Sequence, residues 1–242
     1  MSTTSSAAVI PHVLYAGDSD IARWPLPDVS STTYEPTLTS ESSRLAKSGW
    51  TAGDMLEQLK SMVTGEALTL FGGDGPSYVV VCTVGENDVE SSSDDPASLA
   101  LIVDKIMEGM DMLSNGGGES CAFKGALFFG PKIEPWMFAD PLDVDVGAIL
   151  AHARLSTKIA ARFEERPNFQ FVDCLGMFCD SDKSHTELLM EAVAKKGDGG
   201  AVGAQEFSFT VGTENFNDDL LHLSVDGYGM WDDIVRGWIE TL

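Results

Sequence analysis

The sequence contains few basic residues. Its 242 residues include 38 Asp and Glu but only 15 Lys and Arg, which gives a formal net charge of −23. A nucleic-acid-binding protein needs a basic surface that displaces counterions from phosphates, so this composition argues against nucleic acid as a partner. The same deficit disfavours binding to an anionic membrane surface. The acidity by itself says nothing about the fold.

Long apolar runs and paired cysteines are also missing. No apolar run reaches the length of about 18 residues that spans a bilayer, and the N-terminus lacks the basic start of a signal peptide. We therefore expect a cytoplasmic protein, unless a leader was removed. The four cysteines form no Cys-x-x-Cys pair, which argues against a zinc site or a dense disulfide framework. Cys82 lies inside an apolar run, and we expect it to be a buried thiol.

Motifs for cofactors and metals are absent as well. There is no Gly-x-Gly-x-x-Gly and no Walker-type lysine, so a flavin or nucleotide binder is unsupported. Neither His-Glu-x-x-His nor an EF-hand loop occurs, and we expect neither a metal nor an organic cofactor. A group of acidic residues could suggest a metal, but we interpret it as a solvated loop. The group consists of Glu86, Asp88, Glu90, Asp94 and Asp95.

What the sequence does contain is an alternation of strand and helix signals. Apolar runs typical of buried strands occupy residues 12–16, 78–84, 123–129 and 169–172, with a weaker candidate at 44–47. Apolar residues at helical spacing cover residues 55–63, 96–113, 146–163 and 228–242. Repeated βα units predict an α/β protein with a parallel sheet of about five strands and helices on both faces.

We expect these elements to form a single domain over residues 1–242, because no segment has the composition of a linker. Residues 1–10 are expected to be a flexible N-terminal tail. The Ser/Thr-rich segment 30–43 and the Gly-rich segment 197–203 are expected to be loops.

Four short polar motifs stand beside these elements, three of them at predicted strand ends. They are Gly17-Asp18-Ser19, Ser48-Gly49-Trp50, Gly85-Glu86-Asn87-Asp88 and Asp219-Leu-Leu-His222. The second motif is followed by Thr51 to Asp54, which has the pattern of a helix-starting capping box. Each motif is weak alone. Ligands of parallel sheets bind beyond the carboxyl ends of the strands, so the four motifs in this order indicate one site.

This order of motifs resembles the SGNH hydrolases, also called the GDSL type, over nearly the whole chain. The segments that carry the resemblance are LYAGDSDIARW, SGWTAGDMLEQL, VVVCTVGENDV and DDLLHLSVDGYGMW. It implies a three-layer α/β/α sandwich of flavodoxin-like type. It also implies that Ser19 is the nucleophile, His222 the general base and Asp219 the residue that orients His222. The backbone N–H groups of Ser19 and Gly49 and the side chain of Asn87 would form the oxyanion hole.

Two positions depart from the family pattern. Asp20 stands where the family often has a small or aliphatic residue, and the Asn that often precedes the glycine of the second motif is absent before Gly49. Neither departure touches a catalytic atom. Asp218 is a second candidate for the orienting acid, but its spacing from His222 does not match the motif.

The residue types also suit acyl transfer on chemical grounds. A serine hydroxyl is a weak nucleophile until a positioned base removes its proton. Histidine serves as that base near neutral pH, and a carboxylate such as Asp219 fixes its tautomer. An uncharged oxyanion donor such as the Asn87 amide is typically worth about 10²–10³ in rate. The absence of Gly-x-Ser-x-Gly argues against the competing α/β-hydrolase fold.

The sequence says less about the substrate. Trp24, Trp50 and Trp136 follow predicted strand exits and could line one substrate cleft, although Trp24 and Trp136 could equally pack under loops. An acidic cleft rim would favour neutral esters over anionic ones. The acids expected at that rim are Asp18, Asp20, Glu86, Asp88 and Glu90.

We therefore predict a serine esterase that hydrolyses a small or short-acyl carboxylic ester, as an acetylesterase does, because no long apolar lid segment is present. A lipase, a lysophospholipase or a thioesterase with the same mechanism is an alternative. A non-catalytic binding module on the same fold is another. The sequence does not indicate the oligomeric state.

Overall fold

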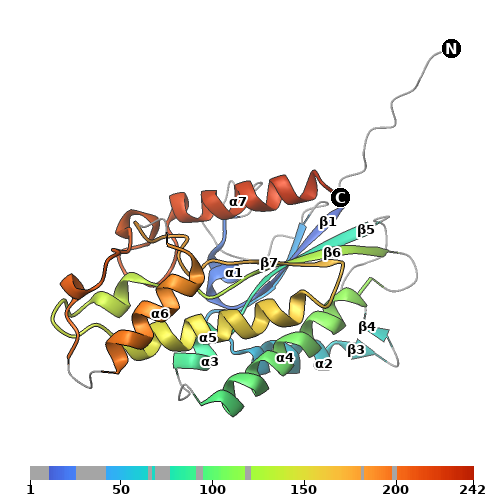
Figure 1. Ribbon diagram of the computed structural model, residues 1–242. Coiled ribbons are helices and arrows are strands. Elements are labelled where there is room, and N and C mark those ends of the chain that lie inside the picture. Colours follow the sequence, from blue (N-terminus) through green and yellow to red (C-terminus); the bar gives the residue numbers. More distant parts are fainter. Residues whose placement is uncertain are drawn as a thin grey trace.

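The computed structural model describes residues 11–25, 42–64, 67–68, 77–90, 95–117, 121–180, 183–197 and 201–242. Its main sheet has five parallel strands in the order β2-β1-β5-β6-β7 (Figure 1). These strands are β1 (His12–Gly17), β2 (Ser42–Ala46), β5 (Ser77–Thr83), β6 (Ala122–Phe129) and β7 (Phe169–Val172). A small antiparallel pair is formed by β3 (Val63–Thr64) and β4 (Ala67–Leu68). The predicted α/β class with a parallel sheet is confirmed.

The helices connect and cover the strands. The α-helices are α1 (Ser19–Arg23), α2 (Ala52–Ser61), α3 (Glu86–Glu90), α4 (Pro96–Ser114), α5 (Val146–Phe163), α6 (His185–Lys196) and α7 (Val225–Ile239). Short 3₁₀ helices are η1 (Pro135–Phe138), η2 (Ala204–Glu206) and η3 (Thr213–Asn215). The predicted capping box of Thr51 and Asp54 starts α2. Among the described residues, no helix is both long and apolar enough to cross a bilayer.

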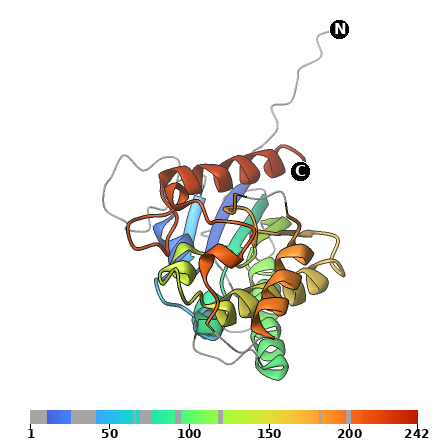
Figure 2. The ribbon, with the colours of Figure 1, turned by 60° about the vertical axis from the view of Figure 1, so that its left-hand side comes forward.

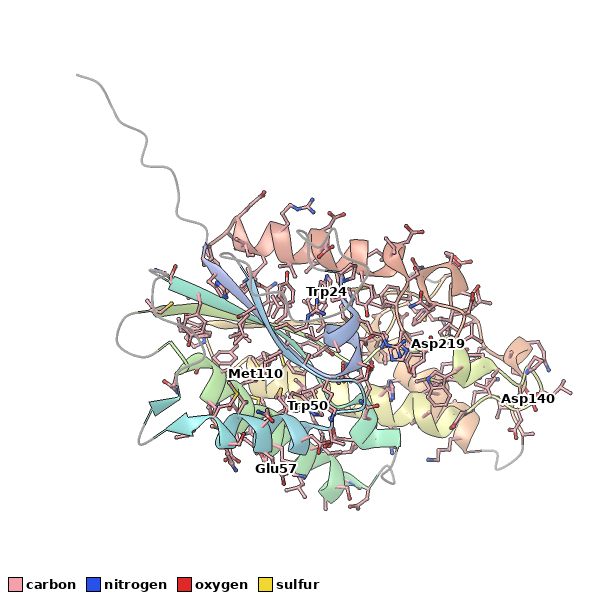
Figure 3. The ribbon with its side chains drawn as sticks, turned by 180° about the vertical axis from the view of Figure 1, so that it is seen from behind. Trp24, Trp50, Glu57, Met110, Asp140 and Asp219 are labelled. Atoms are coloured by element: carbon pink, nitrogen blue, oxygen red, sulfur yellow. The ribbon has the colours of Figure 1, made fainter. Side chains whose placement is uncertain are left out.

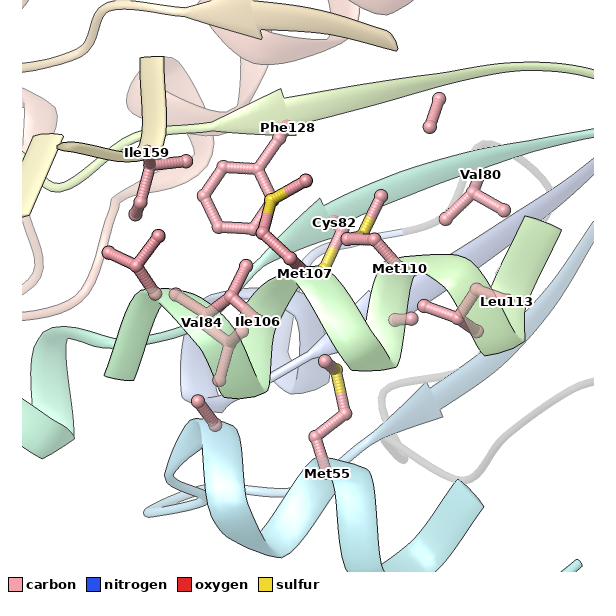
Figure 4. Packing of buried hydrophobic residues seen from close by; sticks show 14 of the residues in the cluster. Met55, Val80, Cys82, Val84, Ile106, Met107, Met110, Leu113, Phe128 and Ile159 are labelled. Atoms are coloured by element: carbon pink, nitrogen blue, oxygen red, sulfur yellow. The ribbon is translucent and has the colours of Figure 1, made fainter. Parts of the chain in front are cut away.

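Helices cover both faces of the sheet. Alternate residues of a strand point to opposite faces, so β1 sends Leu14 to one hydrophobic cluster and Tyr15 to the other. Figure 1 shows α4 and α5 on one side of the sheet and α7 on the other. The first cluster packs the sheet against α2, α4 and α5, and the second packs it against α1 and α7. In the first cluster, Met107 and Met110 of α4 pack beside Cys82 of β5 (Figure 4). Cys82 is fully buried, as expected.

A third hydrophobic cluster extends the molecule beyond the carboxyl ends of the strands. It joins η1, α5 and α6 to residues 202–211. Figure 2 shows α6 alongside α5 at the side of the sandwich. This cluster supports the segment that leads from β6 to α5, which also borders the site described below.

Sequence reasoning missed several elements. Helix α6 was not predicted, because only Leu188 and Ala192 of its residues are buried and its apolar stripe is therefore weak. Its capping box, Ser184 with Glu187, was the available signal. The loop expected at residues 30–43 is wrong at its end, because residues 42 and 43 begin β2. The rest of that loop lies outside the described residues, as do the expected tail 1–10 and residues 198–200 of the expected loop 197–203.

Gly17 ends β1 with a backbone conformation that only glycine adopts easily, at φ +149°. A Cβ atom there would lie 1.9 Å from the Thr83 carbonyl oxygen. We expect Gly17→Ala to lower the free energy of unfolding by about 3 kcal/mol or more, because the backbones of β1 and β5 would have to separate. Urea denaturation measures this change.

The matched control is Gly237→Ala in α7, where a Cβ atom would meet no atom within 4 Å. There the substitution should stabilise the helix by roughly 0.5–1 kcal/mol. Equal stability of the two variants would contradict the close approach at Gly17.

Candidate active site

The candidate nucleophile Ser19 lies directly beyond the carboxyl end of β1, as the first residue of α1. The preceding Asp18 caps this helix, and its Oδ1 accepts a hydrogen bond from the Asp20 amide at 3.2 Å. Asp18 is 1% exposed. Its side chain therefore braces the turn that carries Ser19.

The candidate oxyanion donor Gly49 lies beyond the end of the neighbouring strand β2. Residues 47–50 form a turn closed by a hydrogen bond from the Trp50 amide to the Lys47 carbonyl at 3.2 Å, and Gly49 has φ +80°. A positive φ at this third position is typical of a type II turn and favours glycine. The Lys47 amide donates to the Gly17 carbonyl at 3.3 Å, so the turn lies against the end of β1.

Asn87 lies beyond the end of β5, on the other side of β1. Its Nδ2 donates to the Trp50 carbonyl at 2.9 Å, which joins α3 to the Gly49 turn. Asp88 strengthens this junction, because its Oδ2 accepts from the Ala52 amide at 2.7 Å. Strands β2, β1 and β5 are neighbours in the sheet. After β1 the chain enters β2 on one side, and it later crosses to β5 on the other side of β1. The end of β1 is therefore the switch point where ligands of parallel sheets bind.

His222 and Asp219 are paired on the loop before α7. His222 Nδ1 lies 2.7 Å from Asp219 Oδ2, and Asp219 Oδ1 accepts from the backbone amides of Leu221 and His222 at 3.1 and 3.0 Å. Leu220 between them has a positive φ of 58°, a conformation that costs energy outside glycine. Among the described residues, Asp219 and not Asp218 is the hydrogen-bond partner of the His222 ring.

The Asp219 carboxylate is held ionised. Burial raises its pKa, but the hydrogen bonds from the backbone and side chain of His222 and from the Leu221 amide outweigh burial and keep the pKa below its usual range. Asp219 Oδ2 also accepts from Arg23 at 3.1 Å. Because Arg23 lies on α1, this ion pair docks the His222 loop against the helix that begins with Ser19. Figure 3 shows Asp219 beyond the end of the sheet.

In the described part of the chain, the Ser19 hydroxyl and the outer ring nitrogen of His222 form no hydrogen bond with one another. Catalytic hydrogen bonds are often long in the absence of substrate and shorten when it binds.

A buried group of charges lies next to these residues, and sequence reasoning did not find it. Lys132, 1% exposed, follows β6, and its Nζ lies 2.7 Å from Asp20, 2.8 Å from Glu86 and 2.7 Å from Glu134. Together these four residues are called the Lys132 cluster below. Lys132 stands at a strand exit like the other motifs, and this position was the signal available in the sequence.

The acids expected at the cleft rim are buried. Asp18, Asp20, Glu86 and Asp88 are 1%, 2%, 7% and 8% exposed, and the side chain of Glu90 lies outside the described residues. The predicted acidic rim and the predicted solvated loop at Glu86 and Asp88 are therefore wrong. The Glu86 carboxylate accepts a hydrogen bond from Lys132, and the Asp88 carboxylate accepts one from the backbone amide at the start of α2. The preference for neutral esters, which was derived from the rim, loses its basis.

The three tryptophans do not share a cleft. Trp24 is fully buried against Tyr15, Phe129 and Trp231 under α7, so its expected place in the pocket is wrong. Trp50 is half-buried and packs on the cluster of the opposite face, and Figure 3 shows the two residues on either side of the sheet. Trp136 is half-buried on the third cluster, where its amide donates to the Leu220 carbonyl at 3.2 Å. Trp50 and Trp136 thus contact the candidate site from different sides.

Comparison with known proteins supports this fold. No family model matches the sequence, and no curated protein matches it. A solved structure from Streptococcus pneumonia, described as a platelet activating factor, is similar with a TM-score of 0.58 and 15% identity, covering 97% of this chain and 86% of that one. A protein described as an acylhydrolase from Bacteroides fragilis has a TM-score of 0.57 and 11% identity, covering 95% and 86%.

The lipase Lip_vut3 from a goat rumen metagenome has a TM-score of 0.51 and 14% identity, covering 94% of this chain and 96% of that one. At these identities the likeness concerns the fold. The chain therefore has the α/β fold of these solved proteins, as its resemblance to the SGNH hydrolases predicted.

Proposed function

We propose that the protein is a serine esterase that transfers the acyl group of a small carboxylic ester to Ser19 and then to water. The observation that carries this proposal is the Asp219–His222 pair, 2.7 Å between Oδ2 and Nδ1, docked by Arg23 on the helix that begins with Ser19. An ionised Asp219 bonded to Nδ1 keeps the proton on that nitrogen. The other ring nitrogen, Nε2, is then the proton acceptor that a nucleophilic serine needs.

In this mechanism Ser19 Oγ attacks the ester carbonyl while His222 Nε2 takes the hydroxyl proton. The resulting imidazolium gives that proton to the departing alcohol, which leaves an acyl group on Ser19. A water molecule then attacks the acyl group while His222 takes one of its protons. The imidazolium returns that proton to Ser19 Oγ as the carboxylic acid leaves. Asp219 stabilises the imidazolium during both acylation and deacylation without becoming protonated itself.

When Ser19 attacks, negative charge develops on the ester carbonyl oxygen, and hydrogen-bond donors must be placed to stabilise it. The Ser19 amide, the Gly49 amide and the Asn87 side chain come from the ends of three adjacent strands, which supports their assignment to the oxyanion hole. Gly49 lies in an exposed turn, where its missing Cβ leaves the backbone open to a substrate. The hydrogen bond from Asn87 to the Trp50 carbonyl fixes the amide before the reaction, as electrostatic catalysis requires.

A pocket of about 520 Å³ lies beside these residues. It is lined by Ala22, Arg23, Pro25, Ser48, Asn217, Leu223, Val225 and Tyr228. Its walls therefore adjoin α1, the Gly49 turn and the His222 loop. The volume is within the range of small-molecule sites, which supports a short acyl group or a small alcohol as its occupant. Other proteins with this fold include one described as an acylhydrolase and one described as a lipase, so the fold is compatible with this chemistry.

We expect a fluorophosphonate probe to label the protein at Ser19 alone, because phosphonylation uses the same nucleophile and oxyanion donors as the ester reaction. We expect kcat/KM to fall along a series of 4-nitrophenyl esters from acetate to palmitate. Mass spectrometry of the labelled peptide and initial rates on the ester series measure these results.

Acetylated sugars and an acyl thioester belong in the same series. Faster turnover of palmitate would identify a lipase, and faster turnover of the thioester a thioesterase. Absence of both labelling and turnover would favour a binding module and contradict the proposal.

A further inference from the structure

The Lys132 cluster joins three separate segments of the chain. Lys132 and Glu134 follow β6, Asp20 belongs to α1 and Glu86 to α3. The Lys132 backbone amide also donates to Glu86 Oε1 at 3.0 Å, so Glu86 is bonded to Lys132 through both of its carboxylate oxygens. Lys132 is therefore fixed to α1 by one bond and to α3 by two.

Two members of the cluster are sequence neighbours of proposed catalytic residues. Asp20 follows Ser19, and Glu86 precedes Asn87. The Lys132 ammonium thus lies between the helix of the nucleophile and the helix of the oxyanion donor. Further bonds hold the same backbone, since the Tyr228 hydroxyl donates to the Asp20 carbonyl at 2.9 Å.

The charges of the cluster do not balance if every acid is ionised. Burial lowers the pKa of Lys132, but Asp20, Glu134 and Glu86 outweigh burial and hold that pKa well above its ordinary value, so the ammonium is charged. Burial raises the pKa of Asp20, and it raises the pKa of Glu134 to about 8. The pKa of Glu86 is lowered, because Lys132 outweighs burial there. At neutral pH Glu86 is therefore ionised beside the ammonium, and Glu134 is mostly protonated.

A buried ion pair of this kind gives little net stability, because desolvation offsets the attraction between the charges. Its directional bonds nevertheless restrict the segments they join. Two carboxylate oxygens beside the cluster, Asp18 Oδ2 and Asp20 Oδ1, are buried without a hydrogen-bond partner among the described residues.

Building on the proposed esterase function, we infer that Lys132 is a positioning residue that fixes Ser19 relative to Asn87 by holding Asp20 and Glu86. Lys132 itself touches no reacting atom. A displacement of about 1 Å between a nucleophile and its oxyanion donor costs on the order of 10²-fold in rate. The cost falls on the chemical step, whereas substrate binding uses the adjoining pocket.

The test compares Lys132→Met with the wild type on 4-nitrophenyl acetate, with rates expressed per active site titrated by a fluorophosphonate. We expect kcat to fall by roughly 10- to 100-fold while KM changes by less than about threefold. The rate of phosphonylation should fall in parallel, because it also needs the aligned oxyanion hole. Lys124→Met, the same substitution at an exposed position of β6, is the control and should retain the wild-type kcat.

A second, matched pair of variants tests the inference if Lys132→Met fails to fold. Glu86→Gln weakens the bond that holds α3, so we expect kcat to fall by about 10-fold or more. Glu191→Gln in α6 is the matched control, because it changes a carboxylate that pairs with Lys183 at 2.5 Å and, in the described part of the chain, contacts no member of the candidate site, so its kcat should stay within about threefold.

The outcomes separate the two proposals. A wild-type kcat per titrated site in Lys132→Met, even with a lower melting temperature, would mean a purely structural role and overturn the inference. Equal losses in Glu86→Gln and Glu191→Gln would overturn it too. A wild-type protein that neither hydrolyses esters nor reacts with the probe would overturn the proposed function itself, and the positioning role with it.

Discussion

Replacing Ser19 with alanine is expected to abolish ester hydrolysis. The variant lacks the only oxygen that could form the acyl-enzyme in the proposed mechanism, so kcat should fall by at least about 10⁴-fold. Residual turnover above the uncatalysed rate would come from the oxyanion donors alone. The fold should be intact, because Ser19 is partly exposed and the cap of α1 is supplied by Asp18. Initial rates on 4-nitrophenyl acetate and labelling by the fluorophosphonate measure both consequences.

The control for this variant is Ser61→Ala, which removes an exposed hydroxyl at the end of α2. Its rate and labelling should match the wild type. Full activity of Ser19→Ala, or labelling of another residue in the wild type, would contradict the assignment of the nucleophile.

The second large effect is expected for His222→Ala. Without the imidazole, the Ser19 proton has no acceptor and the leaving alcohol no donor, so kcat should fall by several orders of magnitude. Because the two residues act as a unit in the proposed mechanism, the Ser19→Ala, His222→Ala double variant should be no slower than either single variant by more than about threefold. Steady-state rates of the three variants give this comparison.

The matched control is His185→Ala. His185 also pairs with a carboxylate, since its Nδ1 lies 3.0 Å from Asp173, and that pair stands beyond the end of β7. Strand β7 is three strands from β1, roughly 14 Å at the usual spacing, so this pair cannot reach Ser19. A loss of activity in His185→Ala as large as that in His222→Ala would show that the effect is not specific to the Asp219–His222 pair.

Much of the candidate site could be predicted from chain order. Ser19, Gly49 and Asn87 each follow a strand, and parallel strands that are adjacent in a sheet place their carboxyl ends together. The pairing of Asp219 with His222 was expected from the resemblance to the SGNH hydrolases, and a spacing of three residues lets the Asp219 carboxylate reach His222 Nδ1 within one local turn. Such features depend on residues close in sequence or on the regular geometry of the sheet.

The Lys132 cluster could not be predicted in the same way. Lys132 is 112 residues from Asp20 and 46 from Glu86, and no local pattern connects them. The same holds for the acids that were expected in solvent. Asp20 and Glu86 are shielded from water because the segment after β6 packs against them and places Lys132 between their carboxylates.

By itself, then, the sequence determined the α/β class, the edge of the sheet that carries the candidate site and the four polar motifs proposed to form it. Continuous apolar runs, apolar residues at helical spacing and the common edge of parallel strands suffice for those properties. Only the tertiary structure decided which side chains are buried. Trp24 became core because α7 packs over it, and the acids beside Ser19 and Asn87 became an internal ion-pair network because Lys132 meets them there. Burial depends on contacts between distant segments, and burial together with the charged partners met there sets the free energy of an ionised side chain.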